Sequence, residues 1–320
     1  MRIHAPRLQL DRFTDLSVDD LERLAEVDRV KKHELTDSPS EADVVLFTQC
    51  HMVDWRLRAI TQHPVARRHW QKVMVYDERD NPWRSFPGVY VSAASSSFDS
   101  RFQRAWGYAR VRPLPIPHVD APDLLFSFVG SPTAACRRSL FRLEHKDSVI
   151  EQVQDFVWDS TQPTFEARRR RYGEILARSR FVLCPRGRGT SSFRLYETLA
   201  AGRVPVVISD EWVPPDGPDW SRCSLRIRED EIGSLVETIE RSDRRWAEMS
   251  DAAKATYGEF FSESLAFHRI ASILEDLRRA NTCRRRDWFM EARGVGASLR
   301  DHWQRHTKRL TRDTSTEGRR

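Results

Sequence analysis

The sequence predicts an α/β protein built from two similar units, and three observations support this prediction. Short apolar runs typical of buried parallel strands alternate with helical segments in both halves of the chain. A segment at 112–123 lies between the halves and holds four of the sixteen prolines, so we expect an extended linker there. The length of 320 residues also suits roughly two domains of about 150 residues each.

The first half begins with strands and helices in alternation. Continuous apolar runs at 43–48 and 72–77 predict strands that are covered on both faces, since they lack the alternation of a half-exposed strand. The segments 19–30 and 56–70 are expected to be helices, and 88–92 is expected to be a third strand.

The second half repeats the pattern. Strands are expected at 124–131, 179–184, 204–208 and 224–227, and helices at 165–180, 193–201, 232–239 and 260–279. Gly202 directly follows one of these helices, where a glycine commonly ends a helix.

The positive charge of the chain is concentrated at its C-terminal end. The formal net charge is +6, and the last forty residues alone hold eleven Lys/Arg and five acids, so the rest is neutral. A neutral body does not favour nucleic-acid binding. For the basic segment 281–320 three interpretations stay open: a solvated extension, a helix that packs back across the N-terminal domain, and peripheral contact with an anionic membrane, where each Lys/Arg contributes about 1 kcal/mol.

The cysteine pattern and the hydropathy exclude several protein classes. The five cysteines are scattered, without a CxxC pair or a Cys/His cluster, so neither a structural zinc site nor a disulfide framework is expected. There is no apolar run of transmembrane length, and the first residues lack the apolar core of a signal peptide. We therefore expect a cytoplasmic protein, with a peripheral position at the inner membrane face as the alternative.

The segment CPRGRGTSSFRLYE at 184–197 is the most informative for chemistry. A buried strand is expected to end at Cys184, and a helix is expected to begin near Phe193 with Ser192 as its N-cap. Free backbone N–H groups and the helix dipole at such a point attract anions. The segment is not a Walker A loop, because no GKS or GKT follows.

Side chains within this loop suit a phosphate. Arg186 and Arg188 can donate paired hydrogen bonds, and Gly187 and Gly189 allow the backbone to approach a ligand closely. An ordinary capped turn with solvated arginines explains the same residues, so local chemistry alone does not decide.

Arg194 and Glu197 are three residues apart on the expected helix. This spacing indicates a simple ion pair first, with a role for Glu197 in accepting hydrogen bonds from both ribose hydroxyls as the alternative.

The stretch SRFVLCPRGRGTSSFRLYETLAAGRVPVVISDEWVPP at 179–215 resembles the C-terminal signature of the exostosin-type glycosyltransferases, family 47. Weaker similarity covers LLFSFVGS at 124–131 together with Arg137, and DWSRCSLRIREDEI at 219–232. The N-terminal half agrees with the family only in general pattern.

The resemblance implies a GT-B fold, in which two Rossmann-like α/β domains face a central cleft. The expected parts are an N-terminal acceptor-side domain (1–118), a C-terminal nucleotide-sugar-binding domain (119–280) and a basic C-terminal helix or tail (281–320). It also implies an inverting glycosyltransferase that uses a nucleotide diphosphate sugar, usually UDP-linked, and a glycan, glycolipid or glycoprotein acceptor. No metal or other cofactor is expected, because basic side chains and a helix N-terminus carry the diphosphate charge. The chain resembles a minimal, cytosolic form of the family.

Given the resemblance, we assign the donor site to loop and strand-end residues of the second half. The expected donor-binding residues are Gly130, Ser131, Arg186, Arg188, Thr190, Ser191, Ser192, Arg194, Glu197, Ser209 and Asp210. Arg186 is the first choice for stabilising the leaving diphosphate, and Glu197 would hold the ribose. Arg137 and Arg138 are expected either to assist or to be solvated.

An inverting transfer also needs a base that takes the proton of the acceptor hydroxyl. The loops after the N-terminal strands offer Asp77, Asp80, His51 and Glu78, ranked in that order. Trp55, Trp83 and Tyr90 are candidates for stacking on an acceptor sugar, with core packing as the alternative.

Two other functions stay open at this point. One is a fucosyltransferase-like enzyme that uses a GDP-sugar. The other is a non-catalytic carbohydrate-assembly protein with a decayed transferase fold.

Overall fold

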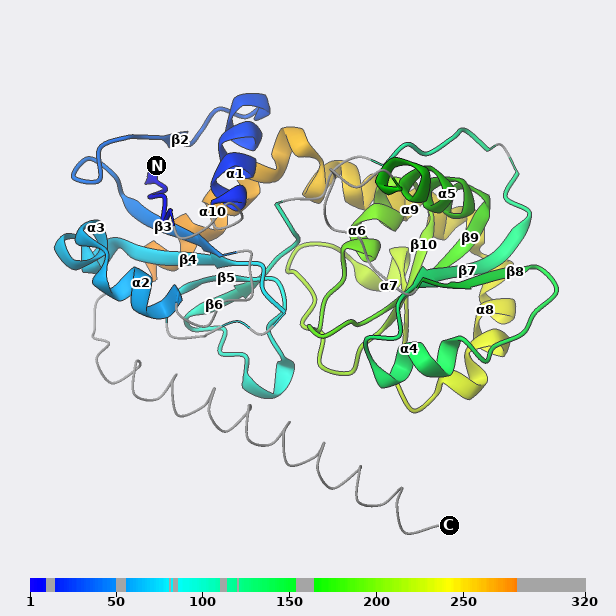
Figure 1. Ribbon diagram of the computed structural model, residues 1–320. Helices are drawn as coiled ribbons and strands as arrows, with labels where there is room; N and C mark the ends of the chain where they lie inside the picture. Colours follow the sequence, from blue (N-terminus) through cyan, green and yellow to red (C-terminus); the bar gives the residue numbers. More distant parts are fainter. Residues whose placement is uncertain are drawn as a thin grey trace, which may run out of the picture.

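The computed structural model describes residues 1–9, 15–49, 56–80, 82, 86–109, 114–119, 121–153 and 164–280. Within them the chain forms two α/β domains side by side, each built on a parallel sheet (Figure 1). This confirms the α/β prediction. The basic segment 281–320 and the predicted site residue His51 lie outside the described residues.

The N-terminal sheet has the strand order β2-β1-β3-β4-β5-β6 and is parallel throughout. Its strands are β1 (Arg2–His4), β2 (Glu34–Leu35), β3 (Val44–Gln49), β4 (Val73–Asp77), β5 (Gly88–Tyr90) and β6 (Gln103–Ala105). Its helices are α1 (Leu16–Val27), α2 (Arg56–Gln62) and α3 (Pro64–Arg68), with short 3₁₀ turns at Trp70–Lys72 and Ser95–Ser97. Strands β3 and β4 are apolar on both faces because helices cover both sides of the sheet.

The C-terminal sheet has the order β11-β10-β9-β7-β8 and is also parallel. Its strands are β7 (Leu124–Gly130), β8 (Ser148–Gln152), β9 (Ser179–Pro185), β10 (Val204–Ile208) and β11 (Leu225–Ile227). The helices are α4 (Ala135–Leu140), α5 (Phe165–Arg178), α6 (Phe193–Ala200), α7 (Trp220–Cys223), α8 (Leu235–Asp243) and α9 (Trp246–Thr256), with a 3₁₀ turn at Ile232–Ser234. One face of the sheet packs against α4 and α8, and the other against α5, α6 and α9.

The two central strands of this sheet part before they end. The pairing of β7 with β9 stops at Ser127 and Val182, although the strands continue to Gly130 and Pro185. The strand order reverses between β7 and β9, and open α/β sheets bind their ligands at such a reversal, outside the carboxyl ends of the strands. The fold therefore marks this point as the place to look for a site.

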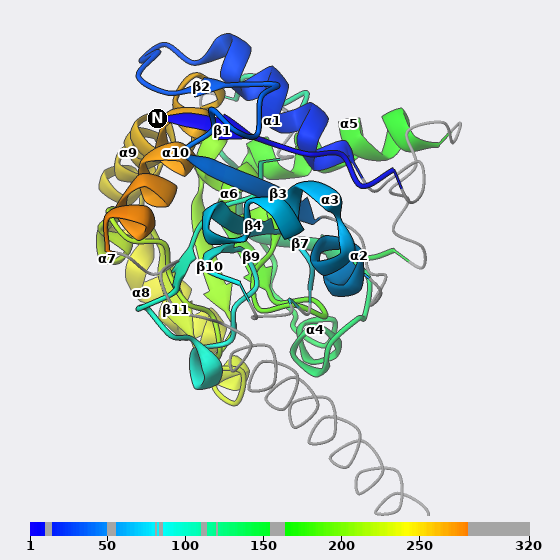
Figure 2. The same cartoon turned by 90° about the vertical axis from the view of Figure 1, so that its left-hand side faces the viewer.

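The last described helix crosses back to the N-terminal domain. A π-helical turn at Tyr257–Phe261 leads into α10 (Glu263–Arg279). Helix α10 packs beside α1 against the N-terminal sheet, where Phe267 and Leu274 share a core with Leu21 and Val44 (Figure 1, Figure 2). By sequence α10 belongs to the predicted range 119–280, but its apolar face is buried in the first domain.

The carboxyl ends of the two sheets face each other across the domain boundary. Tyr108, after β6, stacks on Phe193 at the start of α6, with ring centroids 3.8 Å apart. Ala94, after β5, forms an antiparallel bridge with Trp212, after β10. Two parallel-sheet domains with facing carboxyl edges confirm the predicted GT-B fold.

Some predicted elements differ from the observed ones for local reasons. The expected helix at 56–70 is divided into α2 and α3 at His63, because Pro64 occupies the first turn of α3 and His63 adopts extended backbone as its N-cap. Strands β1, β2, β6 and β8 were not predicted, because none of them contains a continuous apolar run. Among the helices of the described residues, none combines the length and apolar composition that a bilayer span requires.

A glycine at the β4–β5 contact generates a first prediction. A Cβ on Gly88 would lie 2.1 Å from the carbonyl oxygen of Val75, so Gly88→Ala forces the two strands apart. Overpacking of this kind lowers the free energy of unfolding by about 3 kcal/mol, measured by urea denaturation. Gly233→Ala is the control, because nothing lies within 4 Å of a Cβ there. Equal stabilities of the two variants would contradict the prediction.

Candidate functional site

The loop between β9 and α6 lies at the point where β7 and β9 part. The amide of Arg186 donates to the Ile208 carbonyl at 3.0 Å, and the Ser209 hydroxyl donates to the Thr190 carbonyl at 2.8 Å. Ser192 occupies the N-cap position of α6, but its side chain forms no capping hydrogen bond. The loop is thus attached to β10, and the first turn of α6 keeps N–H groups that the Ser192 side chain does not use.

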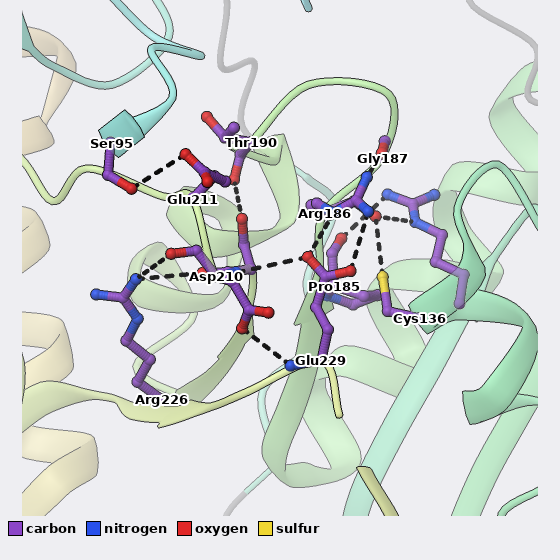
Figure 3. Close-up of polar contacts among 12 residues, drawn as sticks. Ser95, Cys136, Pro185, Arg186, Gly187, Thr190, Asp210, Glu211, Arg226 and Glu229 are labelled. Carbon is purple, nitrogen blue, oxygen red and sulfur yellow. Dashed lines mark hydrogen bonds and ion pairs between the residues drawn. The ribbon is translucent and has the colours of Figure 1, made fainter. Parts of the chain in front are cut away.

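Arg186, the first choice for the diphosphate, is paired with a carboxylate from another loop. Its Nε and Nη2 donate to the Oε1 and Oε2 of Glu229 at 2.5 and 2.9 Å (Figure 3). The predicted donor residue Asp210 in turn accepts from the Glu229 amide at 3.0 Å. The carboxylate of Glu229 neutralises the charge of Arg186. The guanidinium also donates to the Gly187 carbonyl, so it connects two parts of the loop region. Arg188, by contrast, is exposed.

Two other arginines lie at the same place without a carboxylate partner. In the described part of the chain, neither Arg137 nor Arg194 forms an ion pair within 4.0 Å. Arg137 donates to the carbonyls of Arg186 at 2.9 Å, Pro185 at 3.2 Å and Ser131 at 3.4 Å. Burial and the neighbouring Arg194 lower the pKa of Arg137 to about 10.

Arg194 is the more deeply buried of these two arginines. Its Nη2 donates to the carbonyl of Val129, and its Nε has no hydrogen-bond partner in the described residues. Only 7% of Arg194 is exposed. The two arginines therefore bring positive charge to the parting of β7 and β9, and part of their hydrogen-bonding capacity is unused.

Glu197 does not pair with Arg194 in spite of the three-residue spacing. Its Oε2 accepts from the hydroxyl of Tyr172 on α5 at 3.1 Å. Burial raises the pKa of Glu197, although Arg194 and the Tyr172 hydrogen bond act in the opposite direction. Tyr172 gave no signal in the sequence, because nothing in the order of residues shows that α5 lies beside α6.

Gly130 and Ser131 lie where they were predicted, at the end of β7. A Cβ on Gly130 would lie 2.9 Å from the Phe128 ring and 3.2 Å from Nη2 of Arg194. The absence of a side chain at Gly130 therefore makes room for the Arg194 guanidinium. Ser131 is buried and contributes its carbonyl to Arg137.

Loop glycines allow close packing against protein groups. A Cβ on Gly187 would lie 3.3 Å from Nη2 of Arg137. A Cβ on Gly189 would lie 2.8 Å from Oδ1 of Asp80 and 2.7 Å from Oγ of Ser92, both in the N-terminal domain. The loop of the second domain is thus in direct contact with a predicted base of the first.

Asp80 is the candidate base that the structure brings to this loop. The amide of Gly189 donates to its carboxylate, and Arg188 and Arg137 are the nearby charges. Burial raises the pKa of Asp80, while these three groups lower it. Thr190 strengthens the same contact between domains, since its hydroxyl donates to the Ala93 carbonyl at 3.1 Å.

The other described base candidates are held by structural partners. Asp77 is fully buried and accepts paired hydrogen bonds from Arg79, at 2.9 Å to Oδ1 and 2.6 Å to Oδ2. Glu78 accepts from the hydroxyl of Ser17 at 2.8 Å and from the amide of Ala109 at 2.6 Å.

Of the three aromatic residues predicted to stack on an acceptor sugar, one lies within the described residues. Tyr90 is fully buried and donates to the Phe86 carbonyl at 2.6 Å, so it belongs to the core. Trp55 and Trp83 lie outside the described residues.

Ser191 is a further predicted donor residue of this loop. Ser191 is 6% exposed, and its Oγ has no hydrogen-bond partner in the described residues. The same part of the chain contains no group of three or more His, Cys, Asp or Glu side chains that could hold a metal ion. Carboxylates also lie around the loop, so the feature that suits an anionic ligand is the pair of arginines, Arg137 and Arg194, that form no ion pair in the described residues.

Comparison with known proteins agrees with these features. The family model described as Exostosin GT47 domain matches residues 47–242, which is more than half of the chain. An Exostosin-1 homolog of Caenorhabditis elegans is 41% identical over 92 residues, which are 28% of this chain and 24% of that protein. A probable glucuronosyltransferase of Oryza sativa subsp. japonica is 32% identical over 127 residues, 38% of this chain and 29% of that protein. The chain thus spans less than a third of either relative.

Solved structures with a similar arrangement are more distant. An α1,3-fucosyltransferase matches with a TM-score of 0.39 and 12% identity, over 87% of this chain and 89% of that one. A glycosyltransferase from Rickettsia africae ESF-5 matches with a TM-score of 0.41 and 11% identity, over 85% and 83% of the two chains.

The raised pKa of Glu197 generates a prediction about stability. The folded protein keeps this proton to a higher pH than the unfolded chain, whose carboxyl has an ordinary pKa of 4.5. The free energy of unfolding therefore falls as pH rises from that value through the folded pKa. Glu197→Gln removes this fall, so the stability of the variant relative to wild type rises as pH increases above about 4.5, measured by urea denaturation.

Asp123→Asn is the control for the sign of this effect. The hydrogen bond from Arg178 lowers the pKa of Asp123. Wild type therefore gains stability from Asp123 as pH rises from the lowered pKa to the ordinary value of 3.8, so the relative stability of this variant falls below about pH 4 and is level above it. Parallel pH profiles of the two variants would contradict the assignment for Glu197.

Proposed function

This chain belongs to the exostosin GT47 family of glycosyltransferases, and from that premise we propose that it transfers a sugar from a nucleotide diphosphate sugar to a glycan acceptor. The observation that carries the proposal is the pair of arginines without carboxylate partners, Arg137 and Arg194, at the parting of β7 and β9. The donor is a UDP-sugar, and the transfer inverts the anomeric carbon.

The diphosphate would occupy the space in front of this pair of arginines. A leaving nucleotide diphosphate gains negative charge as the glycosidic bond breaks, and fixed cations stabilise that charge. Arg137 and Arg194 have no carboxylate to compete with the phosphate in the described residues, whereas Arg186 is already neutralised by Glu229. The N–H groups at the start of α6 add a further attraction for an anion. These groups support a reaction that needs no metal ion.

Glu197 would hold the ribose of the donor. Its carboxylate is fixed by Tyr172 and has an oxygen, Oε1, without a hydrogen bond in the described residues. A carboxylate accepts hydrogen bonds from two neighbouring hydroxyls without changing its position.

Asp80 would be the base that takes the proton of the acceptor hydroxyl. It comes from the N-terminal domain, where the acceptor would bind, and it contacts the donor loop of the C-terminal domain at Gly189. A carboxyl whose pKa is raised by burial is a stronger base at neutral pH than an exposed one.

Binding of UDP tests the assignment of the diphosphate site. Arg137→Gln and Arg194→Gln each remove a charge-assisted contact worth roughly 1.5–3 kcal/mol, so we expect the Kd of UDP to rise about tenfold or more, measured by calorimetry. Arg138→Gln is the matched control, because Arg138 is the exposed neighbour of Arg137 in the same helix. A chelating agent should leave the affinity unchanged.

Other outcomes of the same titration distinguish the alternatives. Preferential binding of GDP would favour a fucosyltransferase-like donor. Binding of UDP without turnover of any UDP-sugar would favour a non-catalytic assembly protein. Equal affinities in all three variants would remove the basis of the proposal.

Turnover tests the role of Asp80. Asp80→Asn keeps an oxygen that accepts from Gly189 but cannot take a proton, so we expect kcat to fall about a hundredfold or more. The Kd of UDP should stay within about twofold, because the change removes no phosphate contact. Asp99→Asn, in an exposed loop of the same domain, is the control and should leave kcat unchanged. Retained turnover in Asp80→Asn would assign the base to another residue.

A further inference from the structure

We propose that Phe128 is a positioning residue of the donor site, whose ring holds Arg137 and Arg194 in place without cancelling their charge. This inference rests on the proposed function, since it concerns the charge that the diphosphate meets. Phe128 lies in β7, two residues before Gly130, and is fully buried.

One ring lies within reach of both guanidinium groups. The Cζ of Arg194 is 4.9 Å from the centroid of the Phe128 ring, and the Cζ of Arg137 is 5.9 Å from it. Both distances are within the range of about 6 Å in which an aromatic ring attracts a cation. Tyr172 adds a second ring to Arg194, at 5.8 Å.

The two arginines approach Phe128 from opposite sides of the sheet. Arg137 belongs to α4, which packs on the same face as Phe128, while α6 packs on the other face through Leu195 and Leu199. Arg194 reaches Phe128 because β7 and β9 are no longer paired at this level, and because Gly130 has no side chain. The ring is thus the shared contact of two helices that the sheet otherwise separates.

A ring serves this purpose in a way that a carboxylate does not. A carboxylate would fix a guanidinium but would also cancel its charge, as Glu229 does for Arg186. An aromatic ring attracts the cation through its quadrupole and carries no net charge. Both arginines therefore keep a full positive charge for the phosphates while their positions remain defined.

The same strand contains a matched control. Phe126 lies two residues earlier on the same face, is also fully buried and belongs to the same core cluster. Its aromatic neighbour is His145, and it contacts no guanidinium in the described residues. A change in the ring of Phe126 therefore reports the effect on packing alone.

Fluorination of the ring tests the proposal, because it weakens the quadrupole and hardly changes the shape. Trifluorinated phenylalanine is placed at position 128 in one protein and at position 126 in another. We expect the Kd of UDP to rise about fivefold or more for position 128 and to stay unchanged for position 126. Inorganic pyrophosphate should show the same loss for position 128, and the melting temperatures without ligand should be similar.

Phe128→Leu and Phe126→Leu supply a second comparison. Both substitutions remove a ring from the same core, so both should lower the melting temperature. The Kd of UDP should be higher for Phe128→Leu than for Phe126→Leu. If wild type binds UDP and all four proteins bind it equally, Phe128 is only a core residue and the inference is wrong. If wild type binds neither UDP nor pyrophosphate, the proposed function fails, and the inference fails with it.

Discussion

The structure of the site depends on two guanidinium groups, the buried Arg194 and the half-buried Arg137, that form no ion pair in the described residues. Burying a guanidinium without a counter-ion costs free energy, and proteins normally pair such groups. Here the cost is reduced by carbonyl oxygens of Val129, Ser131, Pro185 and Arg186 and by the rings around the two arginines. These partners carry no charge, and the nearby carboxylates of Asp80 and Glu197 form no ion pair with the two arginines. An anion that enters the site therefore gains more from these arginines than from arginines already bound to carboxylates.

The parting of β7 and β9 makes this arrangement available. A continuous ladder to Gly130 and Pro185 would separate the helices on the two faces, and Arg194 could not reach the carbonyl of Val129. The ladder stops three residues early, so groups from both faces meet at the end of the sheet. A reversal of strand order generally indicates the position of a binding site in an α/β sheet. In this protein it explains how two particular arginines come together.

The donor loop also connects the two domains. Gly189 is packed so closely against Asp80 and Ser92 that no side chain fits between them. The position of the loop and the position of Asp80 are therefore coupled, because neither can move toward the other. In the proposed reaction, this contact places the base at a defined distance from the groups that hold the diphosphate.

Much of this fold could be predicted from the sequence, and the site only in part. The strands at 124–130, 179–185 and 204–208 were predicted because continuous apolar runs have few alternative structures. The end of β7, the loop after β9 and Glu197 were assigned to one site, and in the structure Gly130 and Glu197 both lie beside Arg194, because parallel strands end at one edge of the sheet. Arg137 was given only an assisting role, since the spacing of residues does not show which arginine has a counter-ion.

Arg186 and Arg194 have different roles, and this difference shows why a sequence motif alone does not predict which arginine binds phosphate. Arg186 and Arg194 belong to one short motif, and each has the chemistry to bind phosphate. Their environments differ because Glu229, forty-three residues after Arg186, pairs with one of them and not the other. A motif specifies which side chains lie in the loop. Whether their charges are free to bind a ligand depends on residues that are far away in the sequence. Here the neutralised arginine fixes the loop, and that fixed loop places its carbonyls on Arg137, whose charge remains for the ligand.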